Sequence, residues 1–145
     1  MIISKAEVSD LQIIEDCGKK NLPIYYDIKK LNLIFNLNTY NIICCKIDNK
    51  LSGFCIYKID NKLMNVHIMS IAIYKEYRNK KVGTILLNYI KNTSKLFKNI
   101  TLNVQINNNI AGIFYKKNNF NIKFQRKNYY DNLDCNDAYY MEYKI

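Results

Sequence analysis

The stretch HIMSIAIYKEYRNKKVGTILLNYI, from His67 to Ile90, decides the fold of this chain. Its isoleucine-rich first part indicates a strand, and the charged segment KEYRNK that follows predicts a turn. Apolar residues then recur at helical spacing from Val82 to Leu96, which predicts a helix. Because the next segment, NITLNVQI, alternates like a strand, the unit should cross over right-handed with its two strands parallel.

The turn in this unit is unusually basic, with Arg78, Lys80 and Lys81 just before the predicted helix. The helix dipole places partial positive charge at that end, where basic side chains are disfavoured. An anion bound in the turn would remove this disadvantage, because the first N–H groups of a helix have no intrahelical partner. In α/β sheets a ligand is expected at this place, beyond the carboxyl end of the first strand. A solvated surface turn is the alternative explanation.

The segments on either side predict the element order strand, helix, helix, three strands, helix, strand, helix, strand, strand. We expect a short strand in MIISKA, a helix in VSDLQIIEDCGKK and a second helix from Tyr26 to Asn36. A hairpin of YNIICCKID and LSGFCIYKI should turn at Asn49 and Lys50. Downstream, NNNIAGIFYKK predicts a short helix with an asparagine cap, and FNIKFQ and DAYYMEYKI predict strands. Together these elements predict a mixed sheet in an α/β fold.

Length and composition limit the alternatives. With 145 residues, 49% of them hydrophobic, the chain is expected to form one domain, residues 1–145. The net charge of +10 favours anionic partners, but arginine occurs only at Arg78 and Arg126, which argues against specific readout of nucleic-acid bases. Because glycine is scarce, asparagine is expected at positions with positive φ.

Cysteine usage and hydropathy indicate a cytoplasmic protein. The five cysteines form no CxxC pair and the chain has one histidine, so we expect buried reduced thiols and no metal site. The N-terminal segment MIISKAEVSD is too short and too polar for a signal peptide. No apolar run is long enough to span a membrane, so we expect no membrane contact.

Two motifs stand on the predicted helices. In the basic turn, Arg78 is followed at the third and fifth positions by Lys81 and Gly83. Downstream, Asn108 precedes a helix that ends in Phe-Tyr, two lysines and Asn119-Phe120. The motifs resemble the two signatures of the GCN5-related N-acetyltransferase (GNAT) superfamily, with lysine in place of the first glycine of the first signature. Lys81 is expected to donate its N–H with φ below zero, and Asn119 to replace a left-handed glycine.

Longer segments resemble one branch of that superfamily. The segments are similar to catalytic subunits of eukaryotic N-terminal acetyltransferases, and they include NLPIYYD, YNIICCKIDNKLSGF and NITLNVQINN. Within them CCKID, LNVQI and KNYY most resemble the NatE type, and HIMSIA and DAYYMEY have NatA-like features. The resemblance implies a mixed, mostly antiparallel, seven-stranded sheet with a central splayed parallel pair and about four flanking helices. It implies an acetyl-CoA-dependent enzyme that acetylates protein N-termini, in particular those that begin with methionine and a hydrophobic residue.

The resemblance also implies where acetyl-CoA binds. Main-chain groups of the segment Ile71, Ala72 and Ile73 would pair with the pantetheine arm, and Asn108 would contact the arm from the far side. Tyr115 would point at the thioester sulfur, where its phenol can hydrogen-bond or protonate the leaving thiolate. The residues that would hold the pyrophosphate are Arg78, Asn79, Lys80, Lys81, Val82, Gly83 and Thr84.

Two other segments would hold the substrate peptide. Aromatic faces suit an apolar first side chain, and tyrosine hydroxyls can hold a short peptide backbone. The residues that the resemblance places on one wall are Leu22, Pro23, Ile24 and Tyr26. Those on the opposite wall are Tyr129, Tyr130 and Leu133.

The catalytic base is expected to be His67. An α-amine has a pKa of about 8 and must lose a proton to attack a carbonyl. The NatE pattern places a tyrosine and a histidine on two neighbouring strands, where this chain has His67 and Asn103. We expect His67 to accept the proton through a water held partly by Asn103. Packing in the core is the alternative role for a single histidine.

Other functions fit the same sequence. The fold also serves NatA-type, ribosomal-protein and lysine acetyltransferases, which differ in the acceptor of the acetyl group. The replacements at Lys81 and Asn103 would suit a non-catalytic module that binds CoA or docks on the ribosome through its basic surface. The expected partners are protein N-terminal peptides, and further candidates are a NatA-like auxiliary subunit and the ribosome.

Overall fold

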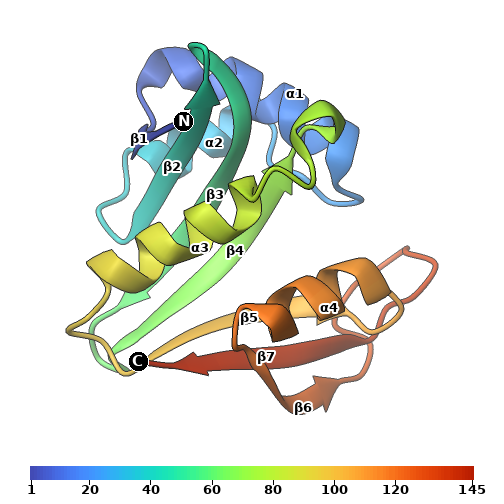
Figure 1. The fold of residues 1–145 in the computed structure, drawn as a ribbon. Coiled ribbons are helices and arrows are strands. Elements are labelled where there is room, and N and C mark those ends of the chain that lie inside the picture. The colour runs from blue at the N-terminus through green and yellow to red at the C-terminus, as the bar shows by residue number, and fades with distance from the viewer.

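Seven strands form one mixed sheet in the order β1-β2-β3-β4-β5-β7-β6, and the computed structural model describes all residues from 1 to 145 (Figure 1). The strands are β1 (Ile2–Lys5), β2 (Tyr40–Ile47), β3 (Lys50–Asp60), β4 (Asn65–Ile73), β5 (Asn99–Gln105), β6 (Asn121–Arg126) and β7 (Ala138–Lys144). The α-helices are α1 (Leu11–Asn21), α2 (Ile28–Phe35), α3 (Val82–Thr93) and α4 (Asn109–Lys117). This element order and the α/β class confirm the prediction.

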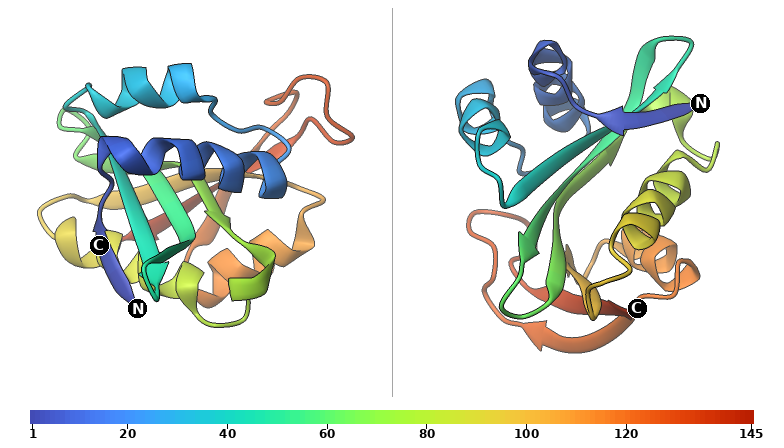
Figure 2. Two further views of the ribbon diagram at one scale, coloured as in Figure 1. Left: turned by 90° about the horizontal axis from the view of Figure 1, so that it is seen from above. Right: turned by 90° about the vertical axis from the view of Figure 1, so that its left-hand side faces the viewer.

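The helices cover the sheet in two layers. Figure 2 shows α1 and α2 on one face and α3 and α4 on the other. Each layer encloses its own core: Leu11, Ile14 and Leu31 pack on the first face, and Leu86 and Ile90 pack on the second. The helical spacing of these apolar residues therefore has its expected cause, burial of one stripe against the sheet. None of the four α-helices is long and apolar enough to cross a membrane.

Short polar residues fix the ends of the elements. The Asp27 side chain accepts a hydrogen bond from the N–H of Lys30, so α2 begins at Ile28 rather than at Tyr26 as predicted. Asn108 caps α4, as expected from its sequence. The β2–β3 hairpin turns at Asp48 and Asn49, one residue earlier than predicted, because both residues adopt the positive φ that a tight hairpin turn requires.

Asparagine replaces glycine in the left-handed region. No glycine of this chain has positive φ, whereas the non-glycine residues that do are Asp48, Asn49, Met64, Asn79, Lys81, Asn119, Asn128 and Asn132. The short polar side chain of asparagine lowers the cost of this conformation relative to other residues. The prediction from the scarcity of glycine is confirmed, including Asn119 after α4.

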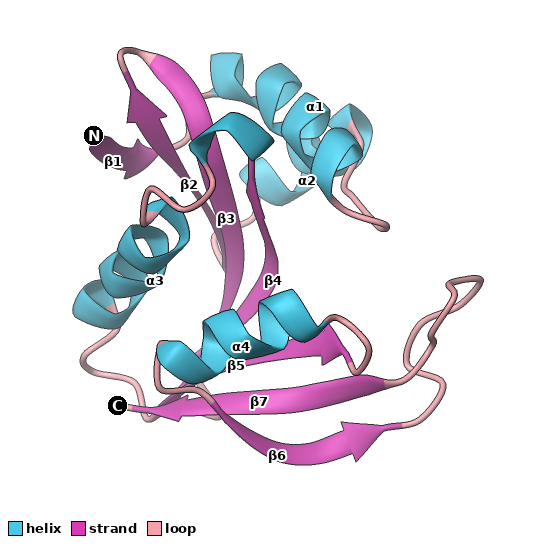
Figure 3. Ribbon diagram, turned by 45° about the vertical axis from the view of Figure 1, so that its right-hand side comes forward, coloured by secondary structure: helices cyan, strands magenta, loops and turns pink.

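The two central strands separate halfway along their length. The parallel pairing of β4 with β5 extends only from Asn65 opposite Asn99 to Ile68 opposite Leu102. The register of β3 against β4 also shifts here, because Ile56 pairs with Ser70 and Tyr57 pairs with Ile68. The bulge at Met69 bends β4, and beyond it β4 and β5 diverge (Figure 3). The predicted splayed parallel pair is confirmed, and its open end forms the candidate site.

Candidate active site

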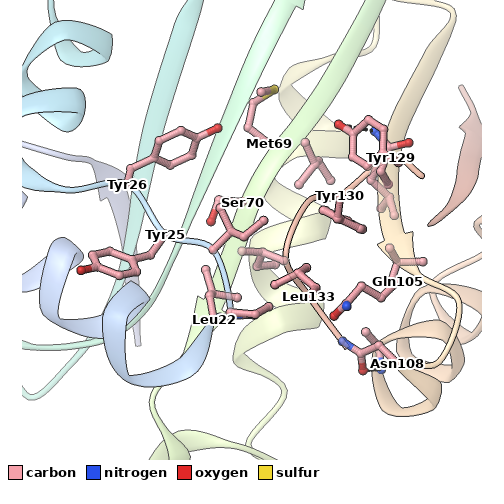
Figure 4. A pocket seen from close by; sticks show the side chains of 18 of the residues that line it. Leu22, Tyr25, Tyr26, Met69, Ser70, Gln105, Asn108, Tyr129, Tyr130 and Leu133 are labelled. Atoms are coloured by element: carbon pink, nitrogen blue, oxygen red, sulfur yellow. Dashed lines mark hydrogen bonds between the residues drawn. The ribbon is translucent and has the colours of Figure 1, made fainter. Parts of the chain in front are cut away.

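A cavity of about 560 Å³ fills the opening between β4 and β5. Its other walls are the loop after α1 and the loop between β6 and β7, which face one another in Figure 4. These four segments are distant in the sequence, and the sheet order brings them together. The predicted site residues that line the cavity are Leu22, Pro23, Ile24, Tyr26, His67, Ile71, Asn103, Asn108, Tyr115, Tyr129, Tyr130 and Leu133.

The remaining predicted acetyl-CoA residues lie outside this cavity. The pyrophosphate residues stand in the turn before α3 and in its first residues, and the pantetheine residues Ala72 and Ile73 stand at the end of β4. Ala72 and Val82 are buried in the two cores, so only their main-chain groups are available to a ligand. Ile73 uses its carbonyl to accept a hydrogen bond from Arg78 Nε at 3.3 Å. The other guanidinium contact runs from Arg78 to Asn21 Oδ1 at 2.8 Å, which ties this turn to the end of α1.

The structure adds lining residues that the sequence did not reveal. Tyr25, Met69, Ser70 and Asp131 all line the cavity. Met69 and Ser70 do so because of the bulge in β4, which simple alternation along a strand does not predict. The sequence signal for Tyr25 was its place between Ile24 and Tyr26 in a loop already assigned to the peptide.

His67 lies at the centre of a polar chain that runs across β4 and β5. Its Nδ1 atom lies 2.8 Å from Thr101 Oγ1, and Thr101 also accepts a hydrogen bond from Asn65 Nδ2 at 2.9 Å. Its Nε2 atom lies 3.4 Å from Asn103 Nδ2. With Asn103 donating to Nε2, the imidazole proton lies on Nδ1 and is donated to Thr101, so the accepting nitrogen faces the cavity side.

Burial lowers the pKa of His67 from 6.5 to about 4, and the positive charges of Arg126 and Lys58 act in the same direction. A buried imidazole loses hydration of its charged form, which disfavours protonation. The ring is therefore neutral and able to accept a proton throughout the physiological pH range. The imidazole is also a weak base, so it quickly releases any proton that it accepts.

Asn103 extends the polar chain to the loop between β6 and β7. Its Nδ2 atom donates to the Tyr129 hydroxyl at 3.2 Å, and its Oδ1 atom is buried without a hydrogen-bond partner. A buried carbonyl oxygen without a partner costs about 1–3 kcal/mol, and Asn65 Oδ1 on β4 is a second such atom. The amide therefore joins the imidazole of His67 to one peptide-side tyrosine.

Tyr115 enters the cavity from α4. Its ring packs between Phe114 and Phe120, with centroid distances of 5.2 and 5.8 Å, and its side chain is buried. Burial raises the pKa of the Tyr115 phenol well above its ordinary value of 10. A phenol held in this way stays protonated and acts as a hydrogen-bond donor.

The basic turn before α3 leaves three main-chain donors free. The N–H of Ile85 bonds to the carbonyl of Lys81, so the N–H groups of Val82, Gly83 and Thr84 have no intrahelical acceptor, and no side chain caps them. Lys81 itself has φ of 63°, so the expectation of φ below zero is wrong. The turn needs a left-handed residue at this point, where the family signature has glycine.

Gly83 is required for packing between helices. A Cβ at this position would lie 2.8 Å from Cζ of Phe114 in α4. The family resemblance places Gly83 among the residues that would hold the pyrophosphate. The structure gives it a second reason, contact between the start of α3 and the aromatic end of α4.

Side-chain hydrogen bonds hold the β6–β7 loop against β5. Gln105 Nε2 donates to the carbonyl of Cys135 at 2.7 Å and to Asp134 Oδ1 at 3.3 Å, and Asn107 Nδ2 donates to Asp134 Oδ2 at 3.2 Å. The N–H of Tyr130 bonds to the carbonyl of Asn136 at 2.9 Å. The wall that carries the two tyrosines is therefore braced from the end of β5.

The three cysteines in β2 and β3 are unsuited to nucleophilic chemistry, whereas Cys135, in the β6–β7 loop, is only partly buried. Cys44, Cys45 and Cys55 are completely buried in β2 and β3. Burial raises the pKa of Cys44 to about 12 and that of Cys55 still further, so neither forms a thiolate at neutral pH. The prediction of buried free thiols in these strands is confirmed.

Several known proteins are similar to this chain in sequence or in fold. A probable N-acetyltransferase, san, from Drosophila melanogaster is 31% identical over 130 residues, which cover 84% of this chain and 65%, slightly under two thirds, of the relative. N-alpha-acetyltransferase 50 from Danio rerio is 29% identical, covering 84% of this chain and 71% of the relative. Arabidopsis thaliana Naa50, solved with the bisubstrate analogue CoA-Ac-MVNAL, has the same fold, with a TM-score of 0.82, 23% identity and coverage of 99% and 98%. Residues 11–120 match the acetyltransferase (GNAT) family, and this chain belongs to it.

Proposed function

We propose that this protein transfers an acetyl group from acetyl-CoA to the α-amine of a polypeptide. The observation that carries the proposal is the cavity between the diverging strands. Two tyrosine-bearing loops line this cavity, which suits an extended peptide, and the buried Tyr115 lines it as well. The family membership of the chain and the names of its relatives support the same reaction.

The residues present fit acetyl-CoA. The edge of β4 that faces β5 is unpaired beyond Ile68, which leaves main-chain groups of Ile71 and the N–H of Ile73 free for an extended amide-containing arm. The carbonyl of Ile73 already accepts a hydrogen bond from Arg78. The free N–H groups at the start of α3, beside Lys80 and Lys81, suit a diphosphate. When bound, acetyl-CoA supplies an acetyl group activated as a thioester.

The direct transfer that we propose forms the amide C–N bond as the C–S bond breaks. Tyr115 donates a hydrogen bond to the departing sulfur, which leaves with the electron pair. Because a thiol has a pKa of about 8.5, far below that of the buried phenol, Tyr115 stabilises the thiolate without transferring its proton. No covalent enzyme intermediate is needed.

His67 takes up the proton that the amine loses, through a water that Asn103 helps to hold. The neutral imidazole presents Nε2 toward Asn103, and the amide of Asn103 reaches the Tyr129 hydroxyl. The nitrogen becomes much more acidic once it is bonded to the carbonyl carbon, so a weak neutral base is sufficient. Proton transfer of this kind contributes about 10²–10⁴-fold to a rate.

The proposed substrates are N-termini that begin with methionine and a hydrophobic residue, as in a NatE-type enzyme of the cytoplasm. The peptide of the analogue bound by the Arabidopsis protein begins with Met-Val, which supports this class. The cavity wall offers Leu22, Pro23 and Ile24 to an apolar first side chain. Further proposed partners are a NatA-like auxiliary subunit and the ribosome.

The test is an initial-rate assay with acetyl-CoA and a panel of short peptides. The panel contains Met-Leu, Met-Val, Ser-first and Ala-first peptides, and one peptide with a blocked N-terminus and a free lysine. The expected result is acetylation of the α-amine of the Met-hydrophobic peptides, located by mass spectrometry. Equal rates on Met-first and Ser-first peptides would exclude the NatE-type preference, and modification of lysine alone would exclude N-terminal transfer. Binding of acetyl-CoA without turnover of any peptide would indicate the non-catalytic alternative.

A further inference from the structure

The sheet face that lies opposite α4 carries a stack of aromatic rings. No helix covers this side of β5, β7 and β6 (Figure 3). Tyr140 stacks on Phe124 with centroids 4.7 Å apart and an interplanar angle of 13°, and on His67 at 6.3 Å and 15°. Tyr140 pairs with Asn103 across the ladder, whereas its neighbour Met141 is buried in the core with α3 and α4. The alternation along β7 therefore turns Tyr140 to the uncovered face.

Tyr129 joins this stack to the candidate active site. We call His67, Tyr140, Phe124 and Tyr129 the aromatic shelf. His67 and Tyr129 line the cavity, and the amide of Asn103 connects them. Phe124 and Tyr129 are 47% and 46% exposed, so both are among the exposed large hydrophobic side chains of the protein. Exposed aromatic area that continues from a substrate cavity is typical of a binding surface.

Two cations accompany the shelf. The guanidinium of Arg126 lies over Tyr140, Phe124 and Tyr129, with its Cζ atom 4.8, 5.1 and 5.9 Å from the ring centroids. Lys58 stands directly opposite His67 in the antiparallel pair of β3 and β4, and its Nζ atom lies 5.6 Å over Tyr40. Lys58 lies on the His67 side of the sheet because directly opposed residues point to the same face, and Arg126 lies there over the ring that stacks on His67. Both cations lower the pKa of His67.

Neither cation has a carboxylate partner within the protein. The three ion pairs of the structure join Lys20 to Asp16, Lys46 to Asp10 and Lys123 to Glu142. Three carboxylates lie near the shelf. Asp137, next to the residue that pairs with Arg126, accepts hydrogen bonds from Gln125 Nε2 and from the N–H of Asn128. Glu142, two residues from Tyr140 on β7, is paired with Lys123, and Asp131 lines the cavity from the β6–β7 loop. The free positive charge on the shelf itself is therefore available to a ligand.

We propose that the aromatic shelf, with Arg126 and Lys58, forms a second subsite that binds an acidic side chain of the substrate polypeptide, in the residues that follow the first one. This inference rests on the proposed function. An extended chain advances about 3.3 Å per residue, so a peptide whose first residue fills the cavity continues across the adjoining surface. A guanidinium held over rings presents its donors to a carboxylate at a lower cost in side-chain entropy than a mobile lysine.

A peptide fits this surface better than a nucleic acid does. Arg126 is the only arginine on the shelf, and the stacking faces of Tyr140 and Phe124 are already used by Arg126 and by one another. Asp131 at the cavity would also repel a phosphate chain. A single carboxylate needs one bidentate partner, which Arg126 provides.

The experiment compares Met-Leu peptides that carry glutamate, glutamine or lysine at the third, fourth or fifth position. For the wild-type protein with acetyl-CoA, we expect glutamate at one of these positions to lower the peptide KM about threefold to fivefold relative to glutamine. The preference should shrink as salt is raised from about 0.05 to 0.5 M. In Arg126→Gln the KM ratio of the two peptides should fall to about one. Lys95→Gln, which removes an exposed charge near the far end of β5, should keep the ratio.

Each outcome has one meaning. Equal KM values for glutamate and glutamine at all positions, or a preference that survives in both Arg126→Gln and Lys58→Gln, would overturn the subsite. A gel-shift assay tests the alternative, binding of a structured RNA. If Arg126→Gln abolishes RNA binding and leaves peptide selectivity unchanged, the shelf is a nucleic-acid surface and the proposal is wrong. Thermal melts establish that each variant is folded. Arg126→Lys serves as a second variant at this position.

Failure of the proposed function is separable from failure of the subsite. If the wild-type protein acetylates no peptide, the anisotropy of fluorescent glutamate and glutamine peptides, measured with protein saturated with CoA, decides the subsite alone. Tighter binding of the glutamate peptide that is lost in Arg126→Gln supports the subsite, and equal binding overturns it.

Discussion

The ring of Phe114 lies against Gly83, at 2.8 Å from the position that a Cβ would occupy. Gly83→Ala should therefore lower the free energy of unfolding by about 1 kcal/mol, because the ring must shift. In a Phe114→Leu background the same substitution should cost close to nothing. Gly112, in α4, has no atom within 4 Å of its Cβ position, so Gly112→Ala should raise the free energy of unfolding by about 0.5–1 kcal/mol. Urea unfolding measures all four variants, and equal effects of the two alanines would contradict this account.

Lys81 carries a backbone strain that glycine would relieve. A left-handed conformation costs an ordinary residue about 1–2 kcal/mol, so Lys81→Gly should stabilise the protein by about 1 kcal/mol. Differential scanning calorimetry measures this stabilisation. In the same experiment the control Lys80→Gly, at a neighbouring position without positive φ, should be neutral or destabilising. If the ammonium of Lys81 is not a ligand, the KM for acetyl-CoA stays the same or falls in Lys81→Gly. A large rise in KM would instead assign the side chain to the pyrophosphate.

His67 makes the fold sensitive to acid. Its pKa in the folded protein is about 4, below the ordinary value, so between pH 6.5 and 4 the unfolded chain binds more protons than the folded one. Stability then rises with pH across this window, and acidification from pH 6.5 to 4 should remove up to about 3 kcal/mol. His67→Gln should lack this part of the loss. Because the chain has a single histidine, one imidazole NMR signal reports the titration directly, and a midpoint near 6.5 would contradict the burial effect.

The pH dependence of turnover should follow the substrate amine rather than His67. The neutral amine becomes available as pH rises toward its pKa of about 8, so kcat/KM should increase about tenfold per pH unit below that value and level off above it. His67 is already neutral in this range. His67→Ala should lower kcat by about 10²-fold without moving the break in the profile. Turnover unchanged across pH 6 to 9 in His67→Ala would remove this residue from the mechanism.

Asp134 should affect the peptide and not acetyl-CoA. It accepts hydrogen bonds from Gln105 and Asn107, which brace the loop that carries Tyr129 and Tyr130. Loss of one such bond is worth about 1 kcal/mol, so Asp134→Ala should raise the peptide KM about fivefold with the acetyl-CoA KM unchanged. The control is Asp60→Ala, which removes a comparable hydrogen bond, from the N–H of Leu63, in the β3–β4 turn. A parallel rise in both KM values would show a general loss of structure instead.

Local patterns predicted the elements, but the exact site depended on irregularities. The spacing of Val82 to Ile90 identified α3, and the pair of strands around it identified the parallel unit. The bulge that brings Met69 and Ser70 into the cavity leaves no trace in apolar alternation. The unexpected φ of Lys81 has the same origin, because loop closure in three dimensions outweighed the local preference of the residue.

Contacts between distant segments were also beyond the sequence. The link of Arg78 to Asn21 joins residues 57 apart, and the stacking of Tyr140 between His67 and Phe124 depends on the order of the strands in the sheet. The segments that carry the candidate peptide walls were identified from resemblance to a family. Their packing against β5, through Gln105, follows only from the folded chain.

Residues along β5 differ in how freely they can be substituted. Ile100, Leu102 and Val104 belong to the core, and two of them, Leu102 and Val104, also line the cavity. Asn103 and Gln105 line the cavity without belonging to the core, and Gln105 braces its wall. A substitution at Asn103 or Gln105 changes the chemistry at the cavity wall without removing a side chain from the core under α3 and α4. New catalytic groups can thus be sampled at such positions with little risk to folding, which is the condition under which an enzyme family diversifies its acceptors.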